Sequence, residues 1–324
     1  MNVSTIPTQQ ENKEIGELIS KGKYEDAIPK LKSLMNESSD KEKLHNALAW
    51  CYYGISNYKE ALIHIEMSLE LNPQSLNSRS IKGCILAEHG IETKSKTKLL
   101  SAKEIFSEIV GVRKNWSSFY NLANTLSALG EYEEAKKMYI KSLKENNKAA
   151  ETWKNLGSCY FHLGNHKKEL VCMDVALSIN PRLSEALISK GVTLGVIFKN
   201  YIKALNLINS VLENDKKICY RWPTIYYWKA KFLSDLSEKE KALNELEEGL
   251  KISPDSIHLL NLKAQILSQL WRIDKDYLAK ASDFFEFRTR INEEDLASIR
   301  ELVLIYRALE KNDKSLSYAL ELIN

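Results

Sequence analysis

Apolar residues recur three and four positions apart along most of the chain, which is the period of an amphipathic helix. Stretches with this period come in pairs, and short polar joints such as LGEYEE (129–134) and LGNHKK (163–168) connect the two members of a pair. Proline follows the second member of several pairs, as at Pro73, Pro181 and Pro254. Proline cannot continue a helix, so it is expected just beyond a helix end. The pattern therefore predicts an all-α chain built of helical hairpins.

The hairpins repeat one another at a fixed spacing. Four windows align, and in each a small residue stands twelve positions before a second marker, which is alanine in three windows and Glu169 in one. The windows are 44–73, 119–147, 153–181 and 226–254, and their small residues are Ala49, Ala123, Gly157 and Ala230. Because one hairpin cannot bury its apolar face alone, we expect the hairpins to stack and to share a continuous core.

The aligned windows resemble tetratricopeptide repeats. The best match lies in one window, at Trp153, Leu156, Gly157, Tyr160, Gly164, Ala176 and Pro181. These residues are therefore expected to be packing positions. Glu169 departs from the family, which usually has a small residue there, and we expect it to loosen the local helix crossing. The resemblance implies an all-α, right-handed α-solenoid of about nine stacked helix-turn-helix hairpins.

The resemblance covers nearly the whole chain and implies its organisation. We expect a flexible N-terminus at residues 1–10 and a tetratricopeptide-repeat solenoid at residues 11–324. The approximate units are 8–41, 42–75, 76–115, 116–149, 150–183, 184–222, 223–256, 257–295 and 296–324. Three units carry extra residues, which form either lengthened helices or loops near a binding face. Pro29 is expected to kink or shorten the second helix of the first unit.

Composition and charge narrow the function classes. Lys and Arg total 46 against 43 Asp and Glu, and nine of the basic residues are Arg, so nucleic acid is not an expected partner. The chain lacks the ~20-residue apolar stretch of a membrane helix, and the N-terminal residues lack the apolar core of a signal peptide. Five scattered cysteines without a CxxC pair indicate reduced thiols. A cytoplasmic location is therefore predicted.

One stretch contains residue types that could carry chemistry. Cys159 and His162 fall on one predicted helix, Cys172 on its partner, and His166 in the joint between them. A metal ion needs ligands that converge on one point, and a nucleophilic cysteine needs an activating base. Because these four residues are divided between two packed helices and a joint, we predict that they are structural. No catalytic residue, metal site or cofactor is predicted, and the chain is not expected to be an enzyme.

In tetratricopeptide proteins the first helix of each hairpin lines the concave surface. Positions on these helices that packing does not require are the candidate partner-binding residues. They are Trp50, Tyr53, Tyr120, Asn121, Asn124, Lys154, Asn155, His162, Tyr227, Trp228, Lys231, Asn261 and Gln265. We expect Asn121 to lie beside Asn155 in a ladder of amides, which can donate to and accept from a peptide backbone.

The leading hypothesis is a non-enzymatic scaffold that binds a protein or peptide segment in the concave groove. The alternative is a sensor or regulatory region of a larger effector assembly, for example one linked to a protease or to bacterial defence. It is favoured because the last unit ends in the apolar stretch LSYALELI (316–323), which a further domain or subunit is expected to cover. A receptor for a small signalling peptide is a third hypothesis.

Overall fold

The computed structural model describes residues 9–35, 38–215, 217–292 and 294–323. Over these ranges the regular secondary structure is entirely helical, which confirms the all-α prediction. Most of the expected flexible N-terminus, residues 1–8, lies outside the described residues, whereas Gln9 and Gln10 begin the first helix.

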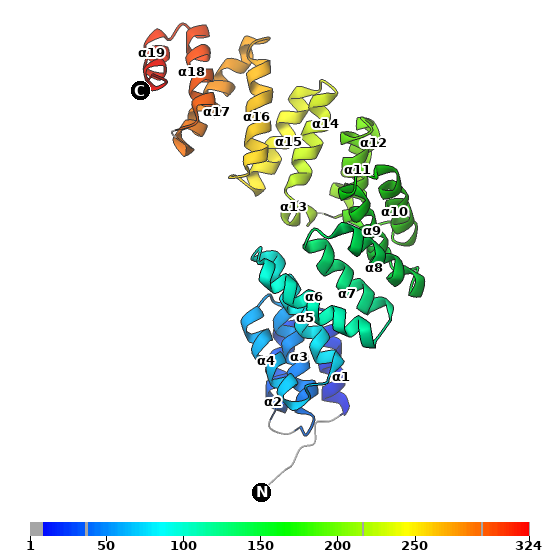
Figure 1. Cartoon of the computed structure of the whole chain (residues 1–324). Helices are drawn as coiled ribbons and strands as arrows, with labels where there is room; N and C mark the ends of the chain where they lie inside the picture. Colours follow the sequence, from blue (N-terminus) through cyan, green and yellow to red (C-terminus); the bar gives the residue numbers. More distant parts are fainter. Residues whose placement is uncertain (1–8, 36–37, 216, 293, 324) are drawn as a thin grey trace. The chain divides into compact units, whose positions relative to one another are not determined.

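The helices pack in successive pairs, as the solenoid prediction requires (Figure 1). Contacts divide the chain into two compact units, Met1–Ile179 (unit 1) and Asn180–Asn324 (unit 2). The pairs of unit 1 are α1 (Gln9–Ser20) with α2 (Tyr24–Leu34), α3 (Lys41–Gly54) with α4 (Tyr58–Leu71), α5 (Leu76–Glu92) with α6 (Lys96–Val112), α7 (Trp116–Ala128) with α8 (Tyr132–Glu145), and α9 (Ala150–His162) with α10 (His166–Ile179).

Unit 2 continues the same scheme with two short additions. Its pairs are α11 (Ser184–Val196) with α12 (Tyr201–Asn214), α14 (Thr224–Asp235) with α15 (Lys239–Ile252), α16 (Ile257–Leu270) with α17 (Leu278–Ile291), and α18 (Leu296–Ala308) with α19 (Asn312–Glu321). The additions are the one-turn helix α13 (Ile218–Arg221) and the 3-10 helix η1 (Lys275–Tyr277).

The joints within the pairs share one backbone device. A residue with positive φ ends the first helix of every described pair except α16–α17. Glycine takes this conformation at no steric cost, as at Gly164, where φ is +72°. There the backbone N–H of Asn165 donates to the carbonyl oxygen of Tyr160 at 2.8 Å. The LGEYEE and LGNHKK joints are therefore short because a left-handed residue reverses the chain in three residues.

The small marker residues lie where the helices of a pair cross. Ala49, Ala61, Ala123 and Ala135 have no exposed surface. At Gly157 a Cβ atom would lie 2.8 Å from Cε of Met173. The same Cβ atom would lie 3.2 Å from Cβ of Cys172, so the space at Gly157 is tight, and the loosening by Glu169 stays a prediction.

The extra residues extend helices as well as loops. The segment between Gly83 and Ala102 lengthens α5 and α6 to 17 residues each, against 14 in α4. The other two insertions form α13 and η1 with their flanking turns. Helix α2 runs through Pro29 and is 11 residues long, in keeping with the expected shortening.

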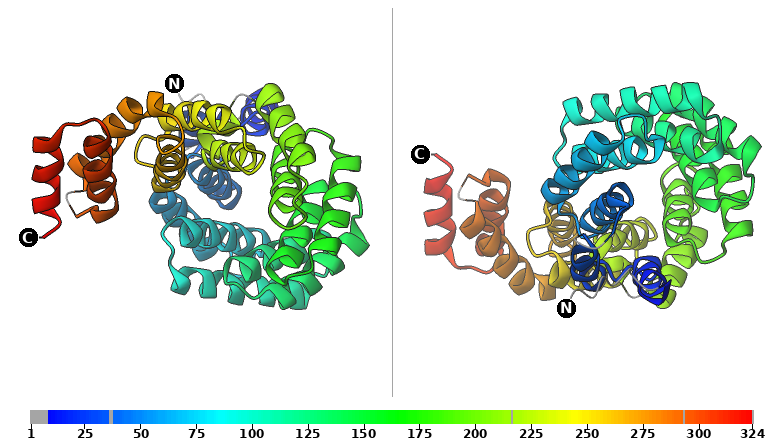
Figure 2. Two further views of the ribbon diagram at one scale, coloured as in Figure 1. Left: turned by 90° about the horizontal axis from the view of Figure 1, so that it is seen from above. Right: turned by 90° about the horizontal axis from the view of Figure 1, so that it is seen from below.

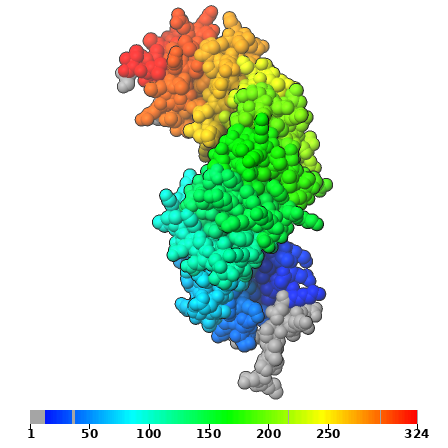
Figure 3. Space-filling model, turned by 45° about the vertical axis from the view of Figure 1, so that its right-hand side comes forward, coloured from blue at the N-terminus to red at the C-terminus, as the bar shows by residue number. Residues whose placement is uncertain are grey.

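Unit 1 has an inner and an outer row of helices. The first helices α3, α5, α7 and α9 contact one another in succession, whereas the second helices of neighbouring pairs touch less. Figure 2 shows the helices of unit 1, blue to green, following an arc. On the face shown in Figure 3 the cyan to blue-green atoms of unit 1 form a continuous surface. The first helices therefore line the inner side of the arc.

Candidate partner-binding pocket in unit 1

The inner side of unit 1 contains a pocket of about 890 Å³. Its walls come from the first helices α3, α5, α7 and α9, with additions from the second helices α6 and α8 and from the joints α5–α6 and α7–α8. Seven predicted binding residues line it, namely Trp50, Tyr53, Tyr120, Asn121, Asn124, Asn155 and His162. These seven residues belong to three hairpins and lie around one cavity.

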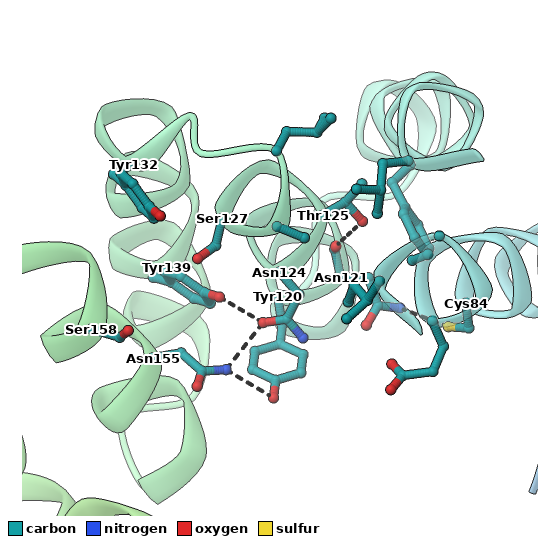
Figure 4. Close-up of a pocket in the computed structure, with 18 of the residues that line it drawn as sticks. Cys84, Tyr120, Asn121, Asn124, Thr125, Ser127, Tyr132, Tyr139, Asn155 and Ser158 are labelled. Atoms are coloured by element: carbon teal, nitrogen blue, oxygen red, sulfur yellow. Dashed lines mark hydrogen bonds between the residues drawn. The ribbon is translucent and has the colours of Figure 1, made fainter. Parts of the chain in front are cut away.

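Hydrogen bonds connect the amides of this pocket to tyrosines (Figure 4). The oxygen Oδ1 of Asn124 accepts from the Tyr139 hydroxyl at 2.6 Å and from Nδ2 of Asn155 at 3.1 Å. The same Asn155 nitrogen lies 3.3 Å from the Tyr120 hydroxyl. Nδ2 of Asn121 points the other way and lies 3.9 Å from Sγ of Cys84. The expectation that Asn155 pairs with Asn121 is therefore wrong. Asn155 pairs instead with Asn124, which lies about one helical turn further along α7.

Tyr139 holds Asn124 in a defined orientation. The tyrosine is 1% exposed, and its burial raises the pKa of the phenol, so the hydroxyl stays protonated and acts as a donor. The Asn124 oxygen accepts both of these hydrogen bonds. The amide nitrogen of Asn124 therefore points away from Tyr139 and Asn155 and can act as a donor. A side-chain amide fixed in this way can meet a carbonyl of a bound chain without losing further rotamer freedom.

Aromatic rings form much of the remaining wall. The rings of Trp50 and Tyr53 lie 5.3 Å apart, centroid to centroid. At the opposite end the imidazole of His162 stacks on Tyr132, with centroids 4.2 Å apart and planes 4° from parallel. These flat surfaces suit apolar or aromatic side chains of a partner.

The sequence reasoning missed several residues that line the pocket. They include Tyr132, Tyr139 and Ser158, together with Lys94 of the α5–α6 joint and Lys96 at the start of α6. Tyr132 and Tyr139 belong to α8, a second helix, and such helices were treated as packing elements. The repeated tyrosine three positions before the second marker, at residues 58 and 132, was the available signal for Tyr132.

The six other predicted binding residues lie elsewhere. Nζ of Lys154 is 2.8 Å from a Glu151 carboxylate oxygen, and Nζ of Lys231 is 2.7 Å from one of Asp235. The rings of Tyr227 and Trp228 meet edge to face at 5.0 Å. Asn261 accepts from Arg288 at 3.0 Å, and Gln265 is exposed. The two pockets found in unit 2 have other linings.

The two thiols and two imidazoles of α9 and α10 lie in separate environments. Cys159 and Cys172 are buried, and burial raises the pKa of the Cys172 thiol to about 12. His162 stacks in the pocket, while Nδ1 of His166 lies 3.4 Å from a carboxylate oxygen of Glu169. Across the described ranges no group of three or more His, Cys, Asp or Glu residues could hold a metal ion.

A second pair of histidines lies between α3 and α4. The Nδ1 atoms of His45 and His64 are 3.0 Å apart. Burial lowers the pKa of both imidazoles, and the neighbouring lysines Lys41 and Lys32 act in the same direction, on His45 and His64 respectively. Glu60 opposes the shift at His64. One imidazole must donate and the other accept, so the contact requires at least one neutral ring.

Comparison with known proteins places these hairpins in a family. Family models described as tetratricopeptide repeat match residues 120–181 and 223–256. The chain therefore contains tetratricopeptide repeats at these residues. It is 26% identical over 271 residues to a TPR repeat-containing protein of Methanocaldococcus jannaschii, covering 78% of this chain and 45% of that protein. It is also 26% identical over 258 residues to anaphase-promoting complex subunit 3 of Schizosaccharomyces pombe, covering 78% of this chain and 36% of that subunit.

Solved structures share the fold of this tetratricopeptide-repeat chain at low sequence identity. The Pseudomonas aeruginosa pilF structure has a TM-score of 0.57 and 13% identity, covering 70% of this chain and 98% of that one. The human IFIT1 dimer with PPP-AAAA has a TM-score of 0.59 and 15% identity, covering 93% of this chain and 68% of that one. The chain spans less than half the length of the two curated relatives. In general terms, tetratricopeptide repeats of this kind form a scaffold for protein interactions. None of the helices in the described ranges is long and apolar enough to cross a membrane.

Proposed function

We propose that this chain is a non-enzymatic scaffold that binds an extended segment of a partner protein in the pocket of unit 1. The observation that carries the proposal is the set of amides in which Tyr139 orients Asn124 and Asn155 donates to it. Amides can pair with the N–H and C=O groups of a peptide backbone, and the rings of Trp50 and Tyr53 supply apolar surface for its side chains. Tyr227, Trp228, Lys231, Asn261 and Gln265 are proposed to contact the same partner further along its chain.

The test is a double substitution that removes amides without disturbing the core. Asn121→Ala with Asn155→Ala leaves the Tyr139 hydroxyl bonded to Asn124, so no buried donor loses its acceptor. Each lost amide contact should cost about 1 kcal/mol of binding free energy, which is roughly a fivefold loss of affinity per site. The urea midpoint should stay close to that of the wild type.

Partner capture from lysate of the native source, followed by mass spectrometry and titration of the recovered partner, provides the measurement. Asn77→Ala is the matched control, because Asn77 is an exposed asparagine of unit 1 outside the pocket lining. Full affinity of the recovered partner for the Asn121→Ala/Asn155→Ala protein would exclude this pocket as its site.

A second candidate function is the regulatory region of a larger assembly. Helix α19 has no buried residue, and its Leu316 and Leu320 are 61% and 52% exposed. One relative is by its name a subunit of a complex. If another subunit covers α19, Leu316→Lys with Leu320→Lys should abolish co-purification of that subunit and leave binding in the unit 1 pocket unchanged. Co-purification unaffected by these two substitutions would exclude α19 as the contact.

A further inference from the structure

A second cavity of unit 1 lies apart from the pocket described above. It has a volume of about 440 Å³ and lies between α8, α9 and α10, and we name it the outer groove. Its lining includes Ile140 and Lys144 from α8, Trp153 and Tyr160 from α9, and Lys168 and Val171 from α10. No residue lines both cavities.

The floor of the outer groove is made by residues that the repeat pattern assigned to packing. Trp153 and Tyr160 pack against the core of unit 1 but are only partly buried. The indole Nε1–H of Trp153 donates to the carbonyl oxygen of Asn147 at 2.9 Å. This bond satisfies the single polar atom of the indole and leaves its carbon surface to the groove.

The walls add apolar surface that is open to solvent. Val171 is 59% exposed and Ile140 is 37% exposed. Together with the two rings they form an apolar cavity whose volume is within the range of about 300–1,000 Å³ that is usual for binding sites. Such a cavity can accept one or two large apolar side chains.

The charged side chains that line the outer groove have one sign. Lys144 and Lys168 line it, and no carboxylate does. Neither lysine forms an ion pair with any residue in the described ranges, and Nζ of Lys168 lies 5.6 Å from the centre of the Tyr160 ring. A lysine without a carboxylate at the edge of an apolar cavity attracts an acidic group of a ligand.

The comparable cavity of unit 2 shows that this charge pattern is not a property of every hairpin. That cavity, of about 500 Å³, lies between α15, α16 and α17. Its lining includes Lys263 and Lys280 but also Glu240, Glu247 and Asp283. Lys263 is paired with Glu247 at 3.3 Å. The positive charge is therefore compensated there and uncompensated at the outer groove.

We propose that the outer groove binds an acidic segment of a protein, which inserts a large apolar side chain against Trp153, Tyr160 and Val171 and places carboxylates beside Lys144 and Lys168. This surface shares no lining residue with the unit 1 pocket and includes side chains of the second helices α8 and α10. The scaffold would then hold two different segments at once.

A differential selection tests the proposal with the full chain. Random twelve-residue peptides displayed on phage are selected on the wild type and counter-selected on the Lys168→Glu/Val171→Glu protein. Both residues are exposed, and circular dichroism establishes that the variant keeps its helicity before use. If the double variant loses helicity, Lys144→Glu is used for the counter-selection, and Lys168→Glu replaces Lys144→Glu in the titration of the selected peptide. Surviving peptides should carry net negative charge and at least one Phe, Trp, Leu or Met.

A surviving peptide is then synthesised and titrated by fluorescence anisotropy. Lys144→Glu, which took no part in the selection, should weaken its binding at least about fivefold, and added salt should weaken it further. Lys167→Glu is the matched control, because Lys167 is an exposed neighbour of Lys168 outside the lining, and it should change affinity less than about twofold. An absence of survivors, survivors without acidic residues, or unchanged affinity for the Lys144→Glu protein would each overturn the proposal. None of these outcomes bears on the amides of the unit 1 pocket.

Discussion

The close crossing of α9 and α10 predicts that Gly157→Ala destabilises unit 1. A Cβ atom at this position would lie 2.8 Å from Cε of Met173, 3.2 Å from Cβ of Cys172 and 3.4 Å from the carbonyl oxygen of Glu169. Cε of Met173 is the end of a flexible side chain and can shift, whereas Cβ of Cys172 is attached to the backbone of α10; both residues are buried, at 1% and 4% exposed. Forcing a methyl group into a packed core costs about 1–3 kcal/mol, while replacing a helical glycine by alanine gains about 0.5–1 kcal/mol. The expected net loss in the free energy of unfolding is about 0–2.5 kcal/mol.

Urea unfolding followed by far-ultraviolet circular dichroism measures this difference. Gly16→Ala is the matched control, because Gly16 lies within α1 of the same unit and a Cβ there would meet nothing within 4 Å. The control should raise the stability of unit 1 by about 0.5–1 kcal/mol, whereas Gly157→Ala should lower it. If both substitutions raise the midpoint, α9 and α10 do not approach as closely at Gly157 as the structure shows.

Three further predictions concern other parts of unit 1. Burial lowers the pKa of His45 and His64 in the folded state, so the unfolded state binds more protons as the pH falls below about 6.5. The protein should therefore lose stability between pH ~7 and the lowered folded pKa, and this loss should be smaller in a His64→Gln protein. Urea midpoints at several pH values that fall equally in both proteins would contradict this. Tyr139→Phe should cost about 0.5–1.5 kcal/mol of stability and weaken partner binding, because Asn124 loses one of the two donors that orient it; a titration with the recovered partner that shows wild-type affinity would remove Tyr139 from the site. Thiol titration at mildly alkaline pH should label Cys172 only on unfolding, because burial raises its pKa to about 12. Metal analysis of protein purified without chelator should find no stoichiometric zinc. Rapid labelling of Cys172 in the native protein, or one bound zinc per chain, would refute its assignment as a structural residue.

The periodic pattern was sufficient to predict the helices and their pairing, whereas the inner position of the first helices was implied by the resemblance to tetratricopeptide repeats. Period and pairing are local properties, since apolar residues three and four apart share one helix face and a left-handed residue such as Gly164 reverses the chain within three residues. The small residues at 49, 123 and 157 likewise mark close crossings that lie within one hairpin. These features depend on residues close together in the sequence, so the sequence determines them without knowledge of how hairpins stack.

Contacts between hairpins were decided by the tertiary structure. Asn121 and Asn124 are one helical step apart on the same face, and the stacking of α9 on α7 selects Asn124 as the neighbour of Asn155. Packing of α8 against α7 within one hairpin brings Tyr139 into the pocket. Stacking between hairpins leaves Trp153, a packing position by its spacing, at the floor of an open groove. The physical reason is that side-chain spacing defines which face a residue occupies, whereas the crossing of two helices, set by the fit of all their side chains together, defines which residue it meets.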